Sequence, residues 1–159
     1  MRWVAKLLLI WTPPFLKAKA CREMSAEFTA LVIDALDGEG PLEAFRGAAW
    51  EAGKRSGDRL KNDLCLGGGY EDAELAWRLV SKFSGMKFTV TRRGGKSLFD
   101  HHVCPVLESG GLTMCRNFCV PFVEGLTASM CPSCAVEIIK GAEGGEPCVK
   151  ALANGGQDA

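Results

Sequence analysis

The sequence has no excess of charge of either sign, because 19 lysine and arginine residues balance 19 aspartate and glutamate residues. A nucleic-acid-binding surface needs clustered basic residues, and the short basic group at residues 92–96 is better explained as a solvated hairpin turn. Nucleotide-binding motifs are lacking too, since the three glycines at residues 67–69 are not followed by Gly-Lys-Ser/Thr. We therefore expect no nucleic-acid partner.

Long apolar segments are also lacking. The stretch from Leu7 to Trp11 is far shorter than the roughly 20 residues of a membrane-spanning helix. It is also short for a secretory signal, and Lys17 and Lys19 lie where a cleavage site prefers small residues. We expect a cytoplasmic protein whose residues 1–21 form an apolar arm that could bind a protein partner or a second copy. Export by an atypical N-terminal signal is the alternative.

Cysteine, by contrast, is concentrated in one part of the chain, because six of the eight cysteines fall between Cys104 and Cys148. A chain of this length can bury a hydrophobic core without covalent staples. Thiols are kept reduced in the cytoplasm. Metal binding, ligand binding or catalysis is therefore favoured over disulfides as the purpose of the cluster.

Hydrophobic periodicity predicts helices in the N-terminal half of the chain, at residues 22–37, 41–61 and 71–83. Gly47, Gly53 and Gly57 lie inside the second helix, where each glycine costs roughly 1 kcal/mol relative to alanine. They predict that another element or a ligand approaches that helix closely.

Alternation with a period of two predicts an antiparallel sheet in the C-terminal half. One hairpin is expected from Met86 to Val103 with its turn at Gly94-Gly95, and two further strands at residues 135–140 and 148–152. A helix at residues 112–127 is inserted between them. The sequence thus predicts one α+β domain over residues 22–152, with N-terminal helices packed on a small sheet and a frayed tail at residues 153–159.

The cysteines lie at positions where they could converge on one metal ion. Cys115 and Cys119 are four residues apart on the inserted helix, so their thiols share one face. Cys131 and Cys134 form a CxxC turn that can bind a metal or act as a redox pair. The soft ligands that the fold could bring together are Cys104, Cys115, Cys119, Cys131, Cys134 and Cys148. They would suit tetrahedral zinc or an iron–sulfur cluster; the alternative is that several are small buried hydrophobic residues.

The two histidines and the nearby carboxylates are the other candidates for chemistry. His101 and His102 are adjacent on a strand, so only one of them can face a given site as a base or ligand. Glu124 and Glu137 are near the cysteines in sequence. Strand alternation favours a solvent-facing position for Glu137.

These motifs resemble a known family. The order of Cys104-Pro105, the helical pair Cys115 and Cys119, Glu137 on a strand, and Gly144-Gly145 before Cys148 resembles the L-2-amino-thiazoline-4-carboxylic acid hydrolase-like family. It also resembles the 4-vinyl-reductase-type hydrocarbon-binding domain, in which cysteines and a strand glutamate hold zinc beside a small-molecule pocket. The likeness covers roughly residues 45–152, and its specific part is residues 104–148. One departure is Lys140, where the second family usually has a cysteine, so Cys131 or Cys134 would have to replace that ligand.

The resemblance implies a hydrolase that opens a C–N bond in a small cyclic amidine. Its catalytic residues would be Cys115 or Cys119 as nucleophile or ligand, His101 or His102 as base, and Glu124 or Glu137 as orienting carboxylate. Zinc would be held by ligands drawn from the six clustered cysteines and Glu137. Two alternatives stay open: a non-catalytic, zinc-braced module for a small hydrophobic ligand, and an iron–sulfur or thiol redox carrier that uses Cys131 and Cys134.

Overall fold

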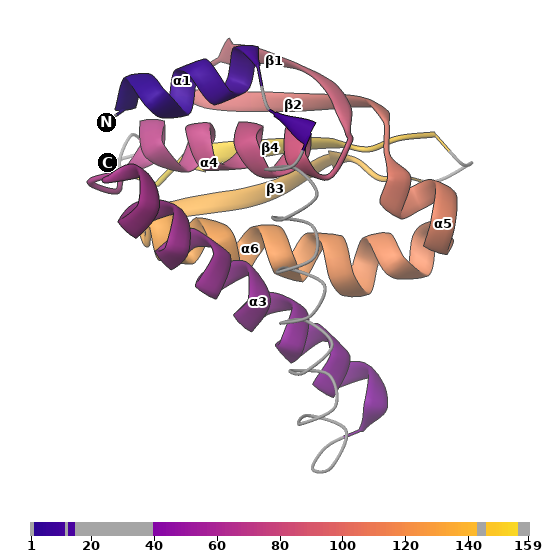
Figure 1. Cartoon of the computed structure of the whole chain (residues 1–159). Coiled ribbons are helices and arrows are strands. Elements are labelled where there is room, and N and C mark those ends of the chain that lie inside the picture. The colour runs from indigo at the N-terminus through magenta and orange to yellow at the C-terminus, as the bar shows by residue number, and fades with distance from the viewer. Residues whose placement is uncertain (1, 12, 15–39, 143–145, 156–159) are drawn as a thin grey trace.

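The computed structural model describes residues 2–11, 13–14, 40–142 and 146–155. In these residues helices pack against a four-stranded antiparallel sheet, which confirms the predicted α+β class (Figure 1). The helix expected at residues 22–37 lies outside the described residues.

The described helices follow the predicted pattern with shifted ends. The helices predicted at residues 41–61 and 71–83 are confirmed as α3 and α4. The inserted helix, predicted at residues 112–127, begins earlier than expected and consists of three segments. The elements are α1 (Arg2–Ile10), α3 (Pro41–Leu64), α4 (Tyr70–Phe83), α5 (Pro105–Met114), the π-helical turn η1 (Cys115–Cys119) and α6 (Val120–Met130).

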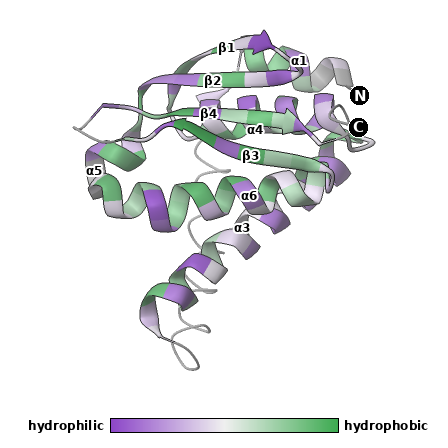
Figure 2. Ribbon diagram, turned by 180° about the vertical axis from the view of Figure 1, so that it is seen from behind, coloured by the Kyte–Doolittle hydropathy of each residue, from purple (hydrophilic) through white to green (hydrophobic). Residues whose placement is uncertain are grey.

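All four predicted strands are present. They are β1 (Lys87–Arg93), β2 (Lys96–Val103), β3 (Cys134–Lys140) and β4 (Val149–Asn154), in the spatial order β1-β2-β4-β3. The last strand in the chain is therefore central, between β2 and β3. It also runs two residues beyond its expected end at Leu152. In the view from behind, the strands lie in front of α4 (Figure 2).

Register places a row of side chains across the helix-facing side of the sheet. Phe99 pairs with Val90 on one side and with Lys150 on the other, and Lys150 pairs with Ile138. Phe99 is fully buried against Trp77 of α4, with ring centroids 4.8 Å apart. Lys150 is only 2% exposed. A lysine thus occupies a core position in the central strand.

The sheet and α4 are backed by a close contact between α3 and α6. A Cβ atom at Gly53 would lie 1.9 Å from the carbonyl oxygen of Phe122, and one at Gly125 would lie 1.9 Å from that of Trp50. Gly57 likewise faces Ser129 of α6, whereas Gly47 has no heavy atom within 4 Å of such a Cβ. The predicted close approach is therefore confirmed at Gly53 and Gly57, and Gly47 takes no part in it.

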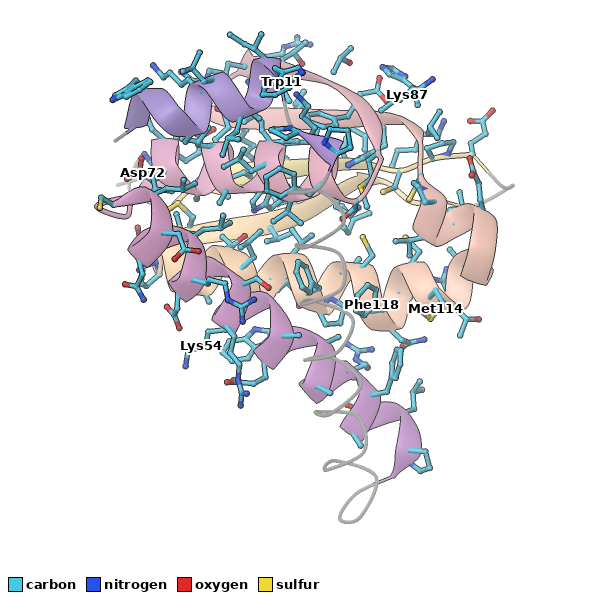
Figure 3. All side chains as sticks on the ribbon, viewed as in Figure 1. Trp11, Lys54, Asp72, Lys87, Met114 and Phe118 are labelled. Carbon is cyan, nitrogen blue, oxygen red and sulfur yellow. A yellow bond between two sulfur atoms is a disulfide. The ribbon has the colours of Figure 1, made fainter. Side chains whose placement is uncertain are left out.

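The short N-terminal helix α1 packs on α4 and presents an apolar outer side. Ala5 is fully buried, and the Lys82 ammonium donates a hydrogen bond to the Leu8 carbonyl oxygen at 3.1 Å. The exposed apolar side chains are Trp3, Leu7, Ile10 and Trp11. Trp11 is labelled in Figure 3. No helix in the described part of the chain has the length and apolar character needed to cross a membrane. Binding of a partner through this arm, and a cytoplasmic location, remain predictions.

The α3–α6 contact should make Gly125 intolerant of any side chain. We expect Gly125→Ala to lower the free energy of unfolding by about 3 kcal/mol, because the added methyl group must push the backbone of α3 away. Gly47→Ala, the matched control on α3, should instead raise stability by up to about 1 kcal/mol through helix propensity alone. Urea unfolding measures both changes. Equal stability of the two variants would contradict the close contact.

Candidate functional site

Four of the six clustered cysteines converge near the junction of β2, β4 and η1. Cys115 and Cys119 come from η1, Cys148 immediately precedes β4, and Cys104 follows β2; all four are buried. Figure 3 shows sulfur atoms gathered between the sheet and the helices α5 and α6. The predicted convergence of strand ends and inserted helix is therefore found for these four thiols.

The cysteine pair on the helix lies in a wide π-helical turn. The backbone N–H of Val120 donates to the carbonyl oxygen of Cys115, five residues back. Pro121 follows and has no N–H, so a regular helical ladder cannot continue through this point. Single π-turns inside helices are frequent at functional sites. Here the turn carries both thiols on the buried side of the helix.

Lys150 lies among these thiols. It shares the inward face of β4 with Leu152, because alternate residues of a strand point the same way. Its Nζ donates hydrogen bonds to Cys148 Sγ at 2.9 Å and to Cys119 Sγ at 3.5 Å. A buried ammonium needs such partners, since burying an unpaired charge is costly.

Cys148 is held as a thiolate by its neighbours. A hydrogen bond with the Cys115 thiol is the largest cause of a lowered Cys148 pKa, and it acts against burial, which alone would raise the value. His101 and the nearby Lys150 lower it further, to about 3. The same hydrogen bond, with burial, raises the pKa of Cys115 far above that of an ordinary thiol. The negative charge of the pair therefore rests on Cys148.

Cys119 stays a protonated thiol and Lys150 stays a charged ammonium beside the Cys148 thiolate. Burial raises the pKa of the Cys119 thiol, and the neighbouring Lys150 only partly opposes that effect. For Lys150 burial alone would lower the pKa, but the sulfur atoms of Cys119 and Cys148 outweigh it and raise the value. The Lys150 ammonium is thus paired with the Cys148 thiolate, beside the protonated thiols of Cys115 and Cys119.

Of the two histidines, His101 faces the cluster. Its backbone N–H and its Nδ1 lie 3.3 Å and 3.1 Å from the carbonyl oxygen of Cys148. Because a carbonyl oxygen only accepts, Nδ1 is the donor of this hydrogen bond. His102 is exposed on the other side of the strand, with Nε2 3.3 Å from Thr89 Oγ1. The prediction that only one histidine can face a site is confirmed.

Two cavities reach this centre from different sides, and Lys150 lines both. The apolar cavity is small and partly open to solvent, and its lining includes Trp77, Val80, Phe118, Phe122, Val123 and Leu126, with His101, Cys119 and Lys150. The arginine-lined cavity is the larger of the two, and its lining includes Arg46, Arg116, Cys115, Cys148 and Lys150.

The CxxC turn differs from the expectation of reduced thiols. Cys131 and Cys134 form a disulfide, with their Cα atoms 5.3 Å apart. The reason is local: Cys131 directly follows α6, and the Cys134 N–H donates to the Cys131 carbonyl oxygen at 2.9 Å, which closes a tight turn. Both sulfur atoms are used in this bond, so neither is a metal ligand in the structure.

The two carboxylates are not brought into the centre. Glu137 on β3 forms an ion pair with Lys96, with Nζ and Oε2 2.7 Å apart, and Glu124 is exposed on α6. Within the described ranges, no three histidine, cysteine, aspartate or glutamate side chains are arranged to hold a metal ion. At the four-thiol centre, the position among the sulfur atoms is taken by the Lys150 ammonium.

Lys150 is the residue that the sequence analysis missed. The signal was present, because Cys148 and Lys150 are two residues apart and share one face if the strand starts as expected at Cys148. An inward Cys148 therefore required an inward lysine. A lysine between apolar neighbours ordinarily indicates the solvent side of a strand.

No protein-family model matches this chain, and comparisons with curated proteins and with solved structures found no match.

Replacing Lys150 by methionine should show how far the ammonium holds the Cys148 thiolate. Methionine has a similar length, so we expect the fold to persist while the pKa of Cys148 rises by at least about one unit. Because a thiol is protonated below its pKa, the midpoint of the ultraviolet thiolate absorbance should move to higher pH. Lys87→Met, which removes an exposed lysine from β1, is the control and should leave the midpoint unchanged. An unmoved midpoint in Lys150→Met would refute this role.

Proposed function

We propose that this domain is a thiol-dependent enzyme that hydrolyses a C–N bond in a small cyclic, amidine-like molecule. The proposal keeps the reaction class implied by the family resemblance. It moves the nucleophile from Cys115 or Cys119 to Cys148. The observation that carries it is the 2.9 Å contact between Lys150 Nζ and Cys148 Sγ, beside a cavity.

A thiolate is the nucleophilic form of cysteine, and a neighbouring cation is a common means of producing it. The Lys150 ammonium supplies that cation from the core of the sheet, where water screens it little. Cys148 also lines the arginine-lined cavity, so a bound molecule has access to its sulfur atom. A structural cysteine buried among apolar side chains would have neither feature.

The arginine-lined cavity favours a substrate with a negative charge. Arg46 and Arg116 line the same space as Cys148, and a guanidinium group suits a carboxylate because it can donate two parallel hydrogen bonds. A ring carboxylate held there would bring the amidine-like carbon toward Cys148. These two arginines are therefore the proposed substrate-binding residues.

The proposed reaction has two steps. Cys148 Sγ bonds to the amidine carbon, and the ring C–N bond breaks as its nitrogen takes a proton from the Cys115 thiol or the Lys150 ammonium. Water then hydrolyses the new C–S bond, returns the proton and restores the thiolate. His101 is a positioning residue in this scheme, since it holds the backbone carbonyl of Cys148.

Zinc or an iron–sulfur cluster at the same thiols remains a prediction from the sequence. The donor set as arranged does not fit either group, because the ammonium of Lys150 lies within hydrogen-bond distance of two of the four sulfur atoms. A metal cation would have to displace it. No step of the proposed reaction therefore passes through a metal.

The nucleophile is tested by Cys148→Ser in assays with 2-amino-thiazoline-4-carboxylate and related cyclic amidines. We expect turnover to fall by roughly 10³-fold or more, because a serine hydroxyl is not ionised beside Lys150. Cys65→Ser removes the exposed free cysteine that follows α3 and is the matched control, with turnover unchanged.

Metal content is measured on the same preparations. Turnover that needs added zinc and disappears with a chelator would reject the thiolate mechanism in favour of a metal-bound water. Absence of turnover with every cyclic amidine, in protein whose Cys148 reacts readily with iodoacetamide, would reject the reaction class.

A second candidate function is favoured by the apolar cavity. Its walls come mainly from α4, η1 and α6 and are mostly aliphatic or aromatic, while Lys150 and His101 supply polar groups on the sheet side. Such a combination suits a small hydrophobic ligand with one anionic group. We propose binding of this kind either as the module's own function or as the site for an apolar part of the substrate.

Filling the apolar cavity should abolish that binding. Val123→Trp places a large ring in the space, and we expect the affinity for a medium-chain fatty acid, measured by calorimetry, to fall at least about tenfold. Glu124→Gln changes the exposed neighbour on the same helix and should bind like the unaltered chain. Equal binding by both variants would place the ligand elsewhere.

A further inference from the structure

We propose that Cys148 and Cys115 are a peroxide-reactive pair: a hydroperoxide oxidises Cys148, and the Cys115 thiol then closes a disulfide between them. This activity goes beyond the proposed hydrolysis. It needs no cyclic substrate, so its test is independent of turnover.

Packing brings the two sulfur atoms together from distant parts of the chain. Cys115 and Cys148 pack together in one small buried cluster with Ala142. One comes from η1 and the other from the residue before β4. Two thiols that pack in one cluster are a candidate pair for a disulfide, because the bond requires the two cysteines to lie close together.

Access for the oxidant is provided by the arginine-lined cavity. Cys115 and Cys148 both line it, as does Lys150. A small hydroperoxide entering there meets the sulfur atom that the ammonium contacts at 2.9 Å. The same cation that favours the thiolate also lies beside the oxygen that leaves as hydroxide or alkoxide.

Cys119 is the competing partner, and the geometry disfavours it. It lines the apolar cavity, whereas Cys115 lines the cavity that Cys148 also faces. Lys150 donates to both Cys119 and Cys148, so the ammonium lies between them as their common partner. Cys115, by contrast, packs with Cys148 in one buried cluster.

The existing disulfide is too far away to exchange with the pair. Cys131 follows the 11 residues of α6, whereas Cys119 immediately precedes them. At 1.5 Å per residue, the helix separates the two ends by roughly 16 Å. The Cys131–Cys134 bond is therefore neither the oxidant nor the resolving group for Cys148.

The chemistry balances with the hydroperoxide as the only oxidant. The Cys148 thiolate attacks the outer oxygen, the O–O bond breaks, and with one proton the products are the Cys148 sulfenic acid and an alcohol or water. The Cys115 sulfur then attacks the sulfenic sulfur, the S–O bond breaks, and the Cys115 proton leaves with the hydroxyl as water. Cys148 has lost its charge at the end, and Lys150 has lost its anionic partner.

The experiment treats the full chain with hydrogen peroxide, blocks remaining thiols with an alkylating reagent, and maps the peptides by mass spectrometry. The expected result is a new cross-link between the Cys115 and Cys148 peptides, with the loss of two hydrogen atoms, that dithiothreitol reverses. A cross-link from Cys148 to Cys119 or to Lys150 would overturn the assignment of Cys115. The assignment of Cys115 would also be overturned if Cys148 became a sulfinic acid while Cys115 remained a free thiol that the reagent alkylates.

Two variants separate a specific pair from general thiol oxidation. In Cys115→Ser the sulfenic acid has no resolving thiol, so Cys148 should pass to the sulfinic acid under the same treatment. Cys65→Ser should form the Cys115–Cys148 bond to the same extent as the unaltered chain. Failure of Cys148 to oxidise in any of these proteins would refute the proposal, while the hydrolysis assay would be unaffected.

Discussion

The hydrogen bonds from the Lys150 ammonium to the sulfur atoms of Cys148 and Cys119 are the interaction on which the rest of the site depends. Lys150, near the start of the central strand β4, exposes only 2% of its surface, so its charge cannot be solvated by water. The thiolate at Cys148 compensates that charge, and the two groups stabilise each other's ionised form. Without the sulfur atoms the lysine would be costly to bury, and without the lysine Cys148 would lose its nearest cation.

Close packing on both sides holds Lys150 and Cys148 in position. Gly53 and Gly125 bring α3 and α6 into backbone contact, so the helix that carries Cys119 has little room to shift. The π-helical turn widens the same helix where Pro121 interrupts its hydrogen bonds, and there it presents Cys115 toward Cys148. On the sheet side, His101 holds the Cys148 carbonyl through two contacts. The thiols are thus positioned by backbone constraints as much as by their own hydrogen bonds.

Much of the scaffold could be predicted from the sequence, because the signals for it are local. The alternation of Phe88 and Val90 and the glycine turn indicate a hairpin, and the glycines of α3 indicate a close neighbour. The inward position of His101 depends on which face of β2 meets the helices, and the sequence of one strand cannot decide that. Lys150 was missed for the same reason. The two-residue spacing puts Lys150 on the same face as Cys148, but whether that face is buried depends on the contact of Cys148 with a helix about 30 residues earlier, which a local pattern does not report.

The order of the sheet has a consequence for how the protein assembles. β4 lies between β2 and β3 and pairs with both of them. The β1–β2 hairpin and β3 are therefore not joined into one sheet until β4 is in place. Pairing of Phe99 with Lys150 closes a loop of about 50 residues, and such non-local contacts form late and slowly. The strand that completes the sheet also carries Lys150, and Cys148 comes directly before it. The reactive thiolate therefore forms at the same step that completes the sheet. In a partly folded chain the cysteines keep their ordinary, less reactive protonated form.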